Sequence, residues 1–149
     1  MADTLRQKIV DAIDARLKTI KTANGYQTNL GNNVFEWRVT PLNSDTELPG
    51  AVYSDTQDTI DLTIGLHLHT LKIVINMAAK GSASPSDMRK LIGDIHKMIG
   101  VDVTWGGLAE DTKITSEIIL PAHEENKFMG IEITIEVEFT TKPFDPFSQ

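Results

Sequence analysis

The sequence predicts an α+β domain in which a single layer of about five to six mostly antiparallel strands packs against two helices. In two segments, near the start and at 84–100, apolar residues recur every three or four positions, the period of a helix lying on a core. Elsewhere apolar and polar residues alternate, most regularly at 129–139, the period of a strand with one buried face. The chain has 149 residues and no internal repeat, so we expect one domain spanning 1–149.

The first helix is expected to begin at Thr4, because Thr4 and Gln7 have the spacing of a capping box. Asn24-Gly25 tolerates the left-handed conformation that often ends a helix, so the helical region is expected to stop there. The face that should lie on the core consists of Leu5, Ile9, Ile13, Leu17 and Ile20.

Three strand-like stretches follow. A strand is expected at 34–39, then a loop bounded by Pro41 and Pro49, then a short strand at 51–55. Apolar residues occupy even positions from 60 to 68 and odd positions from 71 to 77. Such a change of phase moves the apolar side chains to the other face of a straight strand. We therefore expect a hairpin or one long bulged strand, with the bulge or tight turn near His69-Thr70.

The second helix is expected to start at Ser84 as the N-cap, with Pro85 in the first helical position. Asp87 complements the positive end of the helix dipole, and Gly100 should end the helix. Its expected buried stripe is Met88, Leu91, Ile92, Ile95 and Ile99. After the helix we expect a glycine turn at Gly106-Gly107, a strand at 113–120 and a charged turn at 123–127.

The closing strand has two chemically different faces. If the six apolar residues of one face were fully buried, they would contribute about 10–18 kcal/mol gross, so this face should line the core. The other face carries Glu132, Glu136 and Glu138. Carboxylate pairs of glycosidases come from elements that face each other across a cleft. Neighbours on one flat strand are typical of a solvated face instead, and any function of these carboxylates should be electrostatic.

The segment after the closing strand predicts an extended C-terminal arm at about 141–149. Pro143 and Pro146 prevent continuation of the strand, and Phe144 and Phe147 are apolar side chains that often mark interaction sites when exposed. The arm either folds back on its own domain or docks on a neighbouring subunit or partner. Among the tryptophans, Trp105 next to the glycine turn is the better candidate for a surface contact, although burial in the core is the commoner role of a tryptophan.

The composition excludes several classes of function. Without cysteine, the chain has no disulfide, thiol catalysis or thiolate metal site. A net charge of −7 with scattered basic residues is unlike a protein that grips nucleic acid. No apolar run is long enough to cross a bilayer, and the charged, amphipathic start is unlike a signal peptide. Phosphate-binding glycine loops and catalytic serine motifs are lacking, so we expect no enzyme, no catalytic residue and no cofactor.

His67 and His69 leave an alternative open, because their spacing places both on one face of a strand. A metal site needs three or four ligands. The other candidate ligands, His96, His123 and Asp61, follow no recognised spacing. We expect no metal site. The alternative is a small metal-dependent enzyme or ligand-binding domain centred on this histidine pair.

The order of elements and several phrases of the sequence resemble the tail terminator proteins of long-tailed bacteriophages, the family of the minor tail protein U of phage lambda. The resemblance begins with LRQKIVDAIDARLKTIKTANGYQTNLGNNVFEWR. It continues through KGSASPSDMRKLIGDIHKMIG and TWGGLAEDTKITSEI to the closing strand, and so covers nearly the whole chain. Its most distinctive phrases are KTANGYQT and GGLAEDTKI.

The resemblance implies a structural virion protein. Members of this family form a hexameric ring that caps the completed tail tube, stops its polymerisation and joins it to the neck of the filled head. The implied partners are other copies of the chain, the tail tube protein and a head-completion or neck protein, with no membrane involved. DNA passes through the lumen without specific binding. The protein would be made in the host cytoplasm and reside in the virion, at the head-proximal end of the tail. Another phage neck or tail-completion protein is the nearest alternative.

Under this resemblance, acidic side chains that face the channel would repel DNA phosphates. The aromatic arm and the loop at 41–50 would reach a neighbouring ring or subunit. The residues expected at the assembly interface or in the lumen are Glu132, Glu136, Glu138, Trp105, Phe144 and Phe147.

Overall fold

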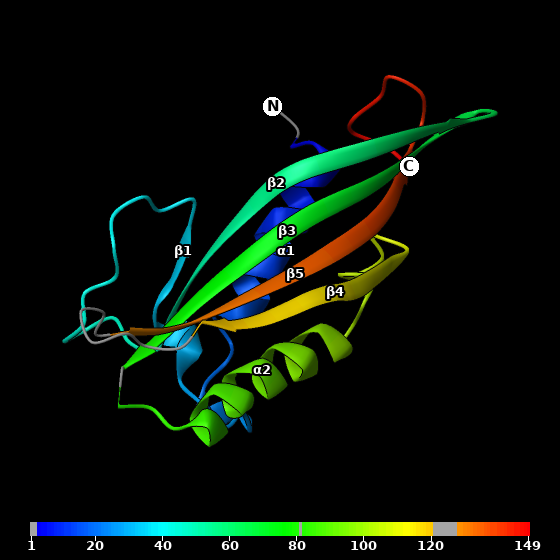
Figure 1. Ribbon diagram of the computed structural model, residues 1–149. Coiled ribbons are helices and arrows are strands. Elements are labelled where there is room, and N and C mark those ends of the chain that lie inside the picture. The colour runs from blue at the N-terminus through cyan, green and yellow to red at the C-terminus, as the bar shows by residue number, and fades with distance from the viewer. Residues whose placement is uncertain (1–2, 81, 121–127) are drawn as a thin grey trace.

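The α+β prediction is confirmed by the computed structural model, which describes residues 3–80, 82–120 and 128–149 (Figure 1). Five strands form one sheet in the order β1-β2-β3-β5-β4. Strand β1 pairs in parallel with β2, and all other pairs are antiparallel. The elements are α1 (Leu5–Leu17), β1 (Val34–Glu36), β2 (Gly50–Thr63), β3 (Leu66–Lys80), α2 (Pro85–Gly100), β4 (Asp111–Leu120) and β5 (Phe128–Thr141). The charged turn expected at 123–127 lies outside the described residues.

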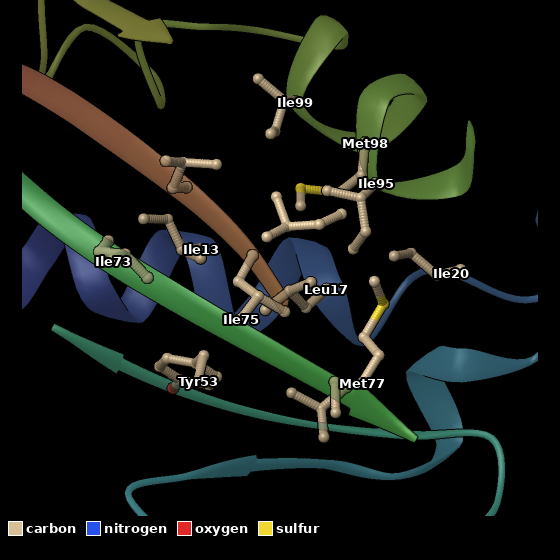
Figure 2. Packing of buried hydrophobic residues seen from close by; sticks show 14 of the residues in the cluster. Ile13, Leu17, Ile20, Tyr53, Ile73, Ile75, Met77, Ile95, Met98 and Ile99 are labelled. Carbon is tan, nitrogen blue, oxygen red and sulfur yellow. The ribbon is translucent and has the colours of Figure 1, made fainter. Parts of the chain in front are cut away.

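Both helices pack on the same face of the sheet, and their apolar side chains form one core with it (Figure 2). In this core Ile13 and Leu17 of α1, Ile95 of α2, and Ile73 and Ile75 of β3 are all buried. We call the opposite face of the sheet, on which no helix of the described residues lies, the open face. Because the helices cover one face only, the side chains of the open face do not belong to this core.

Strand β5 lies inside the sheet, between β3 and the edge strand β4. Its pairing with β3 runs along its whole length, from Phe128 opposite Lys80 to Thr141 opposite His67. The expected burial of its apolar face is confirmed for Ile131, Ile133, Ile135, Val137 and Phe139, while Met129 packs at the margin of the core. The last strand of the chain therefore completes the core.

The change of phase between residues 60 and 77 has a different cause from the one expected. Strand β3 passes through His69-Thr70 without a bulge, and the turn of the hairpin lies at Ile64-Gly65, where Gly65 adopts a φ of 77°. The residues expected as a short strand at 51–55 belong to the long strand β2. Near the turn the hairpin extends past the helices. Both faces are exposed there in the described part of the chain, so burial in the core no longer determines which positions are apolar.

The helix starts were predicted more accurately than the other boundaries. Thr4 and Ser84 are the N-caps, and Ser84 with Asp87 forms a complete capping box. Helix α1 ends at Leu17, earlier than expected, and Gly25, with a φ of 87°, closes a separate short 3₁₀ turn at Thr22–Asn24. Strand β1 ends at Glu36 instead of residue 39, because the next residue has a positive φ.

Asp94 is a buried carboxylate that the sequence analysis did not single out. It projects from α2 and accepts hydrogen bonds from the backbone N–H groups of Gln27 and Thr28, at 3.0 and 2.9 Å, and from the Thr28 hydroxyl at 2.6 Å. The carboxylate thus supplies acceptors for a loop that has no strand partner. It fastens the segment after α1 to the second helix.

Asp94→Ala should lower the free energy of unfolding by about 2–3 kcal/mol, because it leaves buried donors without an acceptor. Urea denaturation measures this change as a lower midpoint with an unchanged slope. Arg89→Ala is the matched control on the exposed side of the same helix, and we expect it to stay within about 0.5 kcal/mol of wild type. Equal effects of the two substitutions would contradict the assigned role of Asp94.

Candidate functional site

The tip of the β2–β3 hairpin, residues 60–66, extends beyond the body of the domain (Figure 1); we call it the projection. Its apolar side chains are exposed: Leu62 is 74% accessible, Ile64 is fully accessible, and Ile60 and Leu66 are about half accessible. Ile60 and Leu62 lie on the helix side of the sheet, opposite His69 and His67, whereas Leu66 lies on the open face. The projection is therefore apolar on both faces.

Of the two alternatives left open for the C-terminal arm, the structure shows the first: the arm folds back on its own domain as a hook. Lys142 and Asp145 form an isolated bridge, and the carbonyl of Pro146 accepts a hydrogen bond from the backbone N–H of Leu5 at 2.9 Å. At the end of the hook, the side-chain amide of Gln149 donates to the carbonyls of Gly107 and Leu108. The hook therefore docks on its own domain.

The hook still presents its aromatic residues to solvent. Phe144 is 92% exposed and Phe147 is about half exposed. The ring of Phe144 meets the ring of His67 edge-on, with 5.0 Å between the centroids, at the base of the projection. The projection and Phe144 thus lie near each other at one end of the molecule, with His67 between Phe144 and Leu62.

The open face carries the carboxylates of β5, as expected. Glu132, Glu136 and Glu138 alternate with buried residues and are partly exposed. The ammonium of Lys113 lies 3.0 Å from the carboxylate of Glu138, which raises the pKa of Lys113, and Lys72 is the cross-strand partner of Glu136. The face is acidic, but two lysines partly balance its charge.

The expectation of a surface contact at Trp105 is wrong. Its side chain is 2% exposed, its indole N–H donates to the hydroxyl of Thr112 at 2.8 Å, and the guanidinium of Arg16 lies over its ring. The loop after α2 turns inward and places this tryptophan in the core. Trp37 is the exposed tryptophan, at 55%, and its indole N–H donates to Asp55. Nothing local in the sequence distinguishes the two.

His69 is enclosed in a hydrogen-bonded row that crosses three strands. Its Nδ1 lies 2.7 Å from the carboxylate of Asp58, and its Nε2 lies 2.9 Å from the hydroxyl of Thr141. The order acid, imidazole, hydroxyl is that of a hydrolase triad. However, Thr141 is only 3% exposed, and the adjoining cavity of about 150 Å³ is smaller than the roughly 300 Å³ at which small-molecule sites begin. We interpret this row as structural.

A metal site at His67 and His69 finds no support in the donor set. Both ring nitrogens of His69 already have partners, and His96 contacts Glu117 at the other end of the domain. His123 lies outside the described residues. Within the described ranges, no group of three or more His, Cys, Asp or Glu side chains could hold a metal ion.

The loop after β1 has a rigid centre. The guanidinium of Arg38 donates to both carboxylate oxygens of Glu47, at 2.6 and 2.8 Å, and the backbone N–H of Asn43 also donates to that carboxylate. The hydrogen bonds from Arg38 and Asn43 lower the pKa of Glu47 to about 2. The loop expected to reach a neighbouring subunit is therefore bridged by an ion pair between its two sides.

Comparison with known proteins adds no relative: no protein-family model matches the chain, and none of the curated proteins matches it. None of the helices in the described part of the chain is long and apolar enough to cross a membrane.

Because the pKa of Glu47 is lower in the folded chain than the ordinary value of about 4.3, the Arg38–Glu47 contact stabilises the fold above about pH 4. This stabilisation is lost as the pH falls toward 2. Glu47→Gln should therefore be less stable than wild type at pH 7, and the difference should shrink between about pH 4 and pH 2. Urea denaturation across this range measures it, with the exposed Glu36→Gln as the control. A difference independent of pH would refute the assignment.

Proposed function

We propose that the protein is a tail terminator of a long-tailed bacteriophage, a structural virion protein that forms a ring on the completed tail tube. In this proposal the ring stops tube growth and joins the tail to the head-completion or neck protein. DNA crosses the lumen without being bound specifically. The protein is made in the host cytoplasm and ends in the virion.

The observation that carries the proposal is the apolar surface made by the projection and Phe144. Exposed apolar surface of this kind marks an interaction site. Burying four such side chains in a neighbouring copy would contribute about 6–12 kcal/mol gross. That is of the order of the free energy of micromolar binding, about −8 kcal/mol, before the cost of association is subtracted. A contact of this strength, repeated around a ring, supports an assembly role.

The acidic open face supports the same proposal. A channel for DNA has to let phosphates pass, and like charge on its wall prevents the passage from becoming a binding site. Glu132, Glu136 and Glu138 supply that charge on a surface that carries no helix. If the open face lines the lumen, the helices lie outside, where they can meet other proteins.

A ring should be visible by negative-stain electron microscopy of the concentrated protein, or of the protein mixed with tubes of its tail tube protein. Leu62→Glu combined with Ile64→Glu should weaken ring formation by about 100-fold or more, because two apolar contacts are replaced by desolvated charges. Val101→Glu, at an exposed apolar residue on the end of α2, is the matched control. Failure of the wild-type protein both to form rings and to cap tubes would refute the proposal. Rings found only at the neck would favour another neck or tail-completion protein.

Reversing the charge of Glu132, Glu136 and Glu138 to Lys should leave ring formation intact and slow DNA passage, because cations on the channel wall bind phosphates. The measurement is the rate of DNA ejection from reassembled particles, with the three Glu→Gln changes as the neutral control. Slowing should diminish as salt is added. Unchanged ejection in intact rings would show that this face does not line the lumen.

A further inference from the structure

We infer that neighbouring copies join by strand pairing, with the free edge of β4 of one copy hydrogen-bonded to the free edge of β2 of the next. This inference rests on the proposed ring and specifies its interface. The partner is thus a second copy of the same chain, bound through main-chain hydrogen bonds in addition to its apolar side chains.

The sheet has two free edges in the described part of the chain. Strand β1 pairs with β2 only at Ala51, Val52 and Tyr53, so the later part of β2 has no outer neighbour. The guanidinium of Arg6 donates a hydrogen bond to the carbonyl of Asp55, and residue 56 is a bulge. The part of β2 whose outer edge could accept another strand is therefore 57–63. Strand β4 pairs only with β5, so its outer edge is free at 111–120. Unpaired edges of this length readily accept another strand.

The direction of the strands suits a ring. Strands β2 and β4 are antiparallel to each other, because β2, β3, β5 and β4 alternate in direction along the sheet. Copies related by rotation about an axis along the strands would therefore pair β4 with β2 in the commoner, antiparallel manner. The two edges differ, so the contact is head-to-tail and can close into a ring.

The amount of stagger between copies follows from the register. Within one copy, Thr59 of β2 is level with Asp111, the first residue of β4, through the pairs with Thr70 and Glu138. In a neighbour without stagger, the residues of β2 after Thr59 would therefore extend past the start of β4 and remain unpaired. Pairing all of 57–63 requires a shift of at least about four residues, or about 13 Å along the strands, over four strands that span about 19 Å. These lengths give a strand tilt of about 35°, which lies at the edge of the range of closed barrels, roughly 35–45°.

The sign of the stagger decides which face is inside. Helix α2 connects β3 to β4, which run in the same direction, and such crossovers are right-handed. A right-handed crossover fixes on which side of β3 the strand β4 lies, and therefore in which direction each copy is shifted along the strands relative to the last. With that shift, the strands coil around the ring axis in the usual right-handed sense only if the open face is inside. The pairing of the edges thus places Glu132, Glu136 and Glu138 in the lumen, an argument independent of their charge.

Side chains support a stagger of four residues. This stagger places Asp61 opposite Lys113 of the neighbour, on the open face, and Ile60 opposite Ile114, on the helix side. Thr115 stands out of register in β4, so the next position after Ile114 is Ser116. A stagger of two would place Asp61 opposite Asp111, and a stagger of six would place it opposite Ser116. Only the stagger of four therefore joins Asp61 to a cation of the neighbour, which favours it. The same stagger places Asp58 opposite Glu117, and each of these carboxylates already has a histidine partner in its own copy.

The absence of cysteine from the chain permits a direct test with engineered disulfides. At a stagger of four, Thr59 lies opposite Ser116 of the next copy. Within one chain the two residues are three strand spacings apart across the sheet, about 14 Å, and are also displaced along the strands, so they are too far apart for a disulfide. Rings of the double variant Thr59→Cys/Ser116→Cys should therefore oxidise to a ladder of covalent oligomers that ends at the ring size. Non-reducing electrophoresis of the oxidised rings measures the ladder. Each single-cysteine variant is a control and should stop at the dimer or below.

The register is checked with Thr59→Cys/Ile118→Cys, which should cross-link efficiently only at a stagger of six. A ladder from this variant and none from the first would overturn the inferred register. Rings seen by microscopy without a ladder from either variant would overturn strand pairing while leaving the proposed function intact. A ladder from a protein that never caps tail tubes would support the pairing and refute the tail terminator proposal. Absence of both rings and ladders, with or without tubes, would overturn both.

Discussion

The pairing of β5 with a strand on each side is the constraint on which the rest of the structure depends. The strand lies between β3 and β4, so it completes the hydrogen bonding of both neighbours and supplies the apolar face on which the helices pack. Its alternation leaves one side chain in two for the open face, where the glutamates lie. The acidic face is therefore the reverse side of the core. A substitution that shifted the register of β5 by one residue would exchange the two faces and destroy both.

The hairpin of β2 and β3 has two parts: one contributes to the core, and the other is the exposed projection. Over the helices, Leu71, Ile73, Ile75 and Met77 obey the alternation that a core demands. Past His69 the helices end, and the apolar residues of the projection no longer have a core to enter. Two-stranded ribbons of this kind are marginally stable alone. The row from Asp58 through His69 to Thr141, and the hook that packs Phe144 against His67, hold the base of the ribbon in place.

The sequence predicted what depends on near neighbours and missed what depends on distant ones. Ser84, Pro85 and Asp87 define a helix start within four residues, and the alternation of the closing strand needs no other segment, so both were predicted correctly. The burial of Trp105 depends on Arg16 and Thr112, and the role of Asp94 depends on a loop 66 residues earlier in the chain. The hairpin turn was misplaced because its only signal is the single Gly65, while the change of phase drew attention to His69.

The charge of the open face also bears on when copies can meet. Each copy carries a net charge of −7, and bringing these faces around a common channel concentrates like charge in a small volume. At low ionic strength this repulsion reaches about 30 Å, whereas at physiological salt it fades within about 8 Å. The apolar projection attracts at contact only, and salt does not screen that attraction. Solutions of low ionic strength would therefore keep the protein dispersed, and added salt would allow it to assemble.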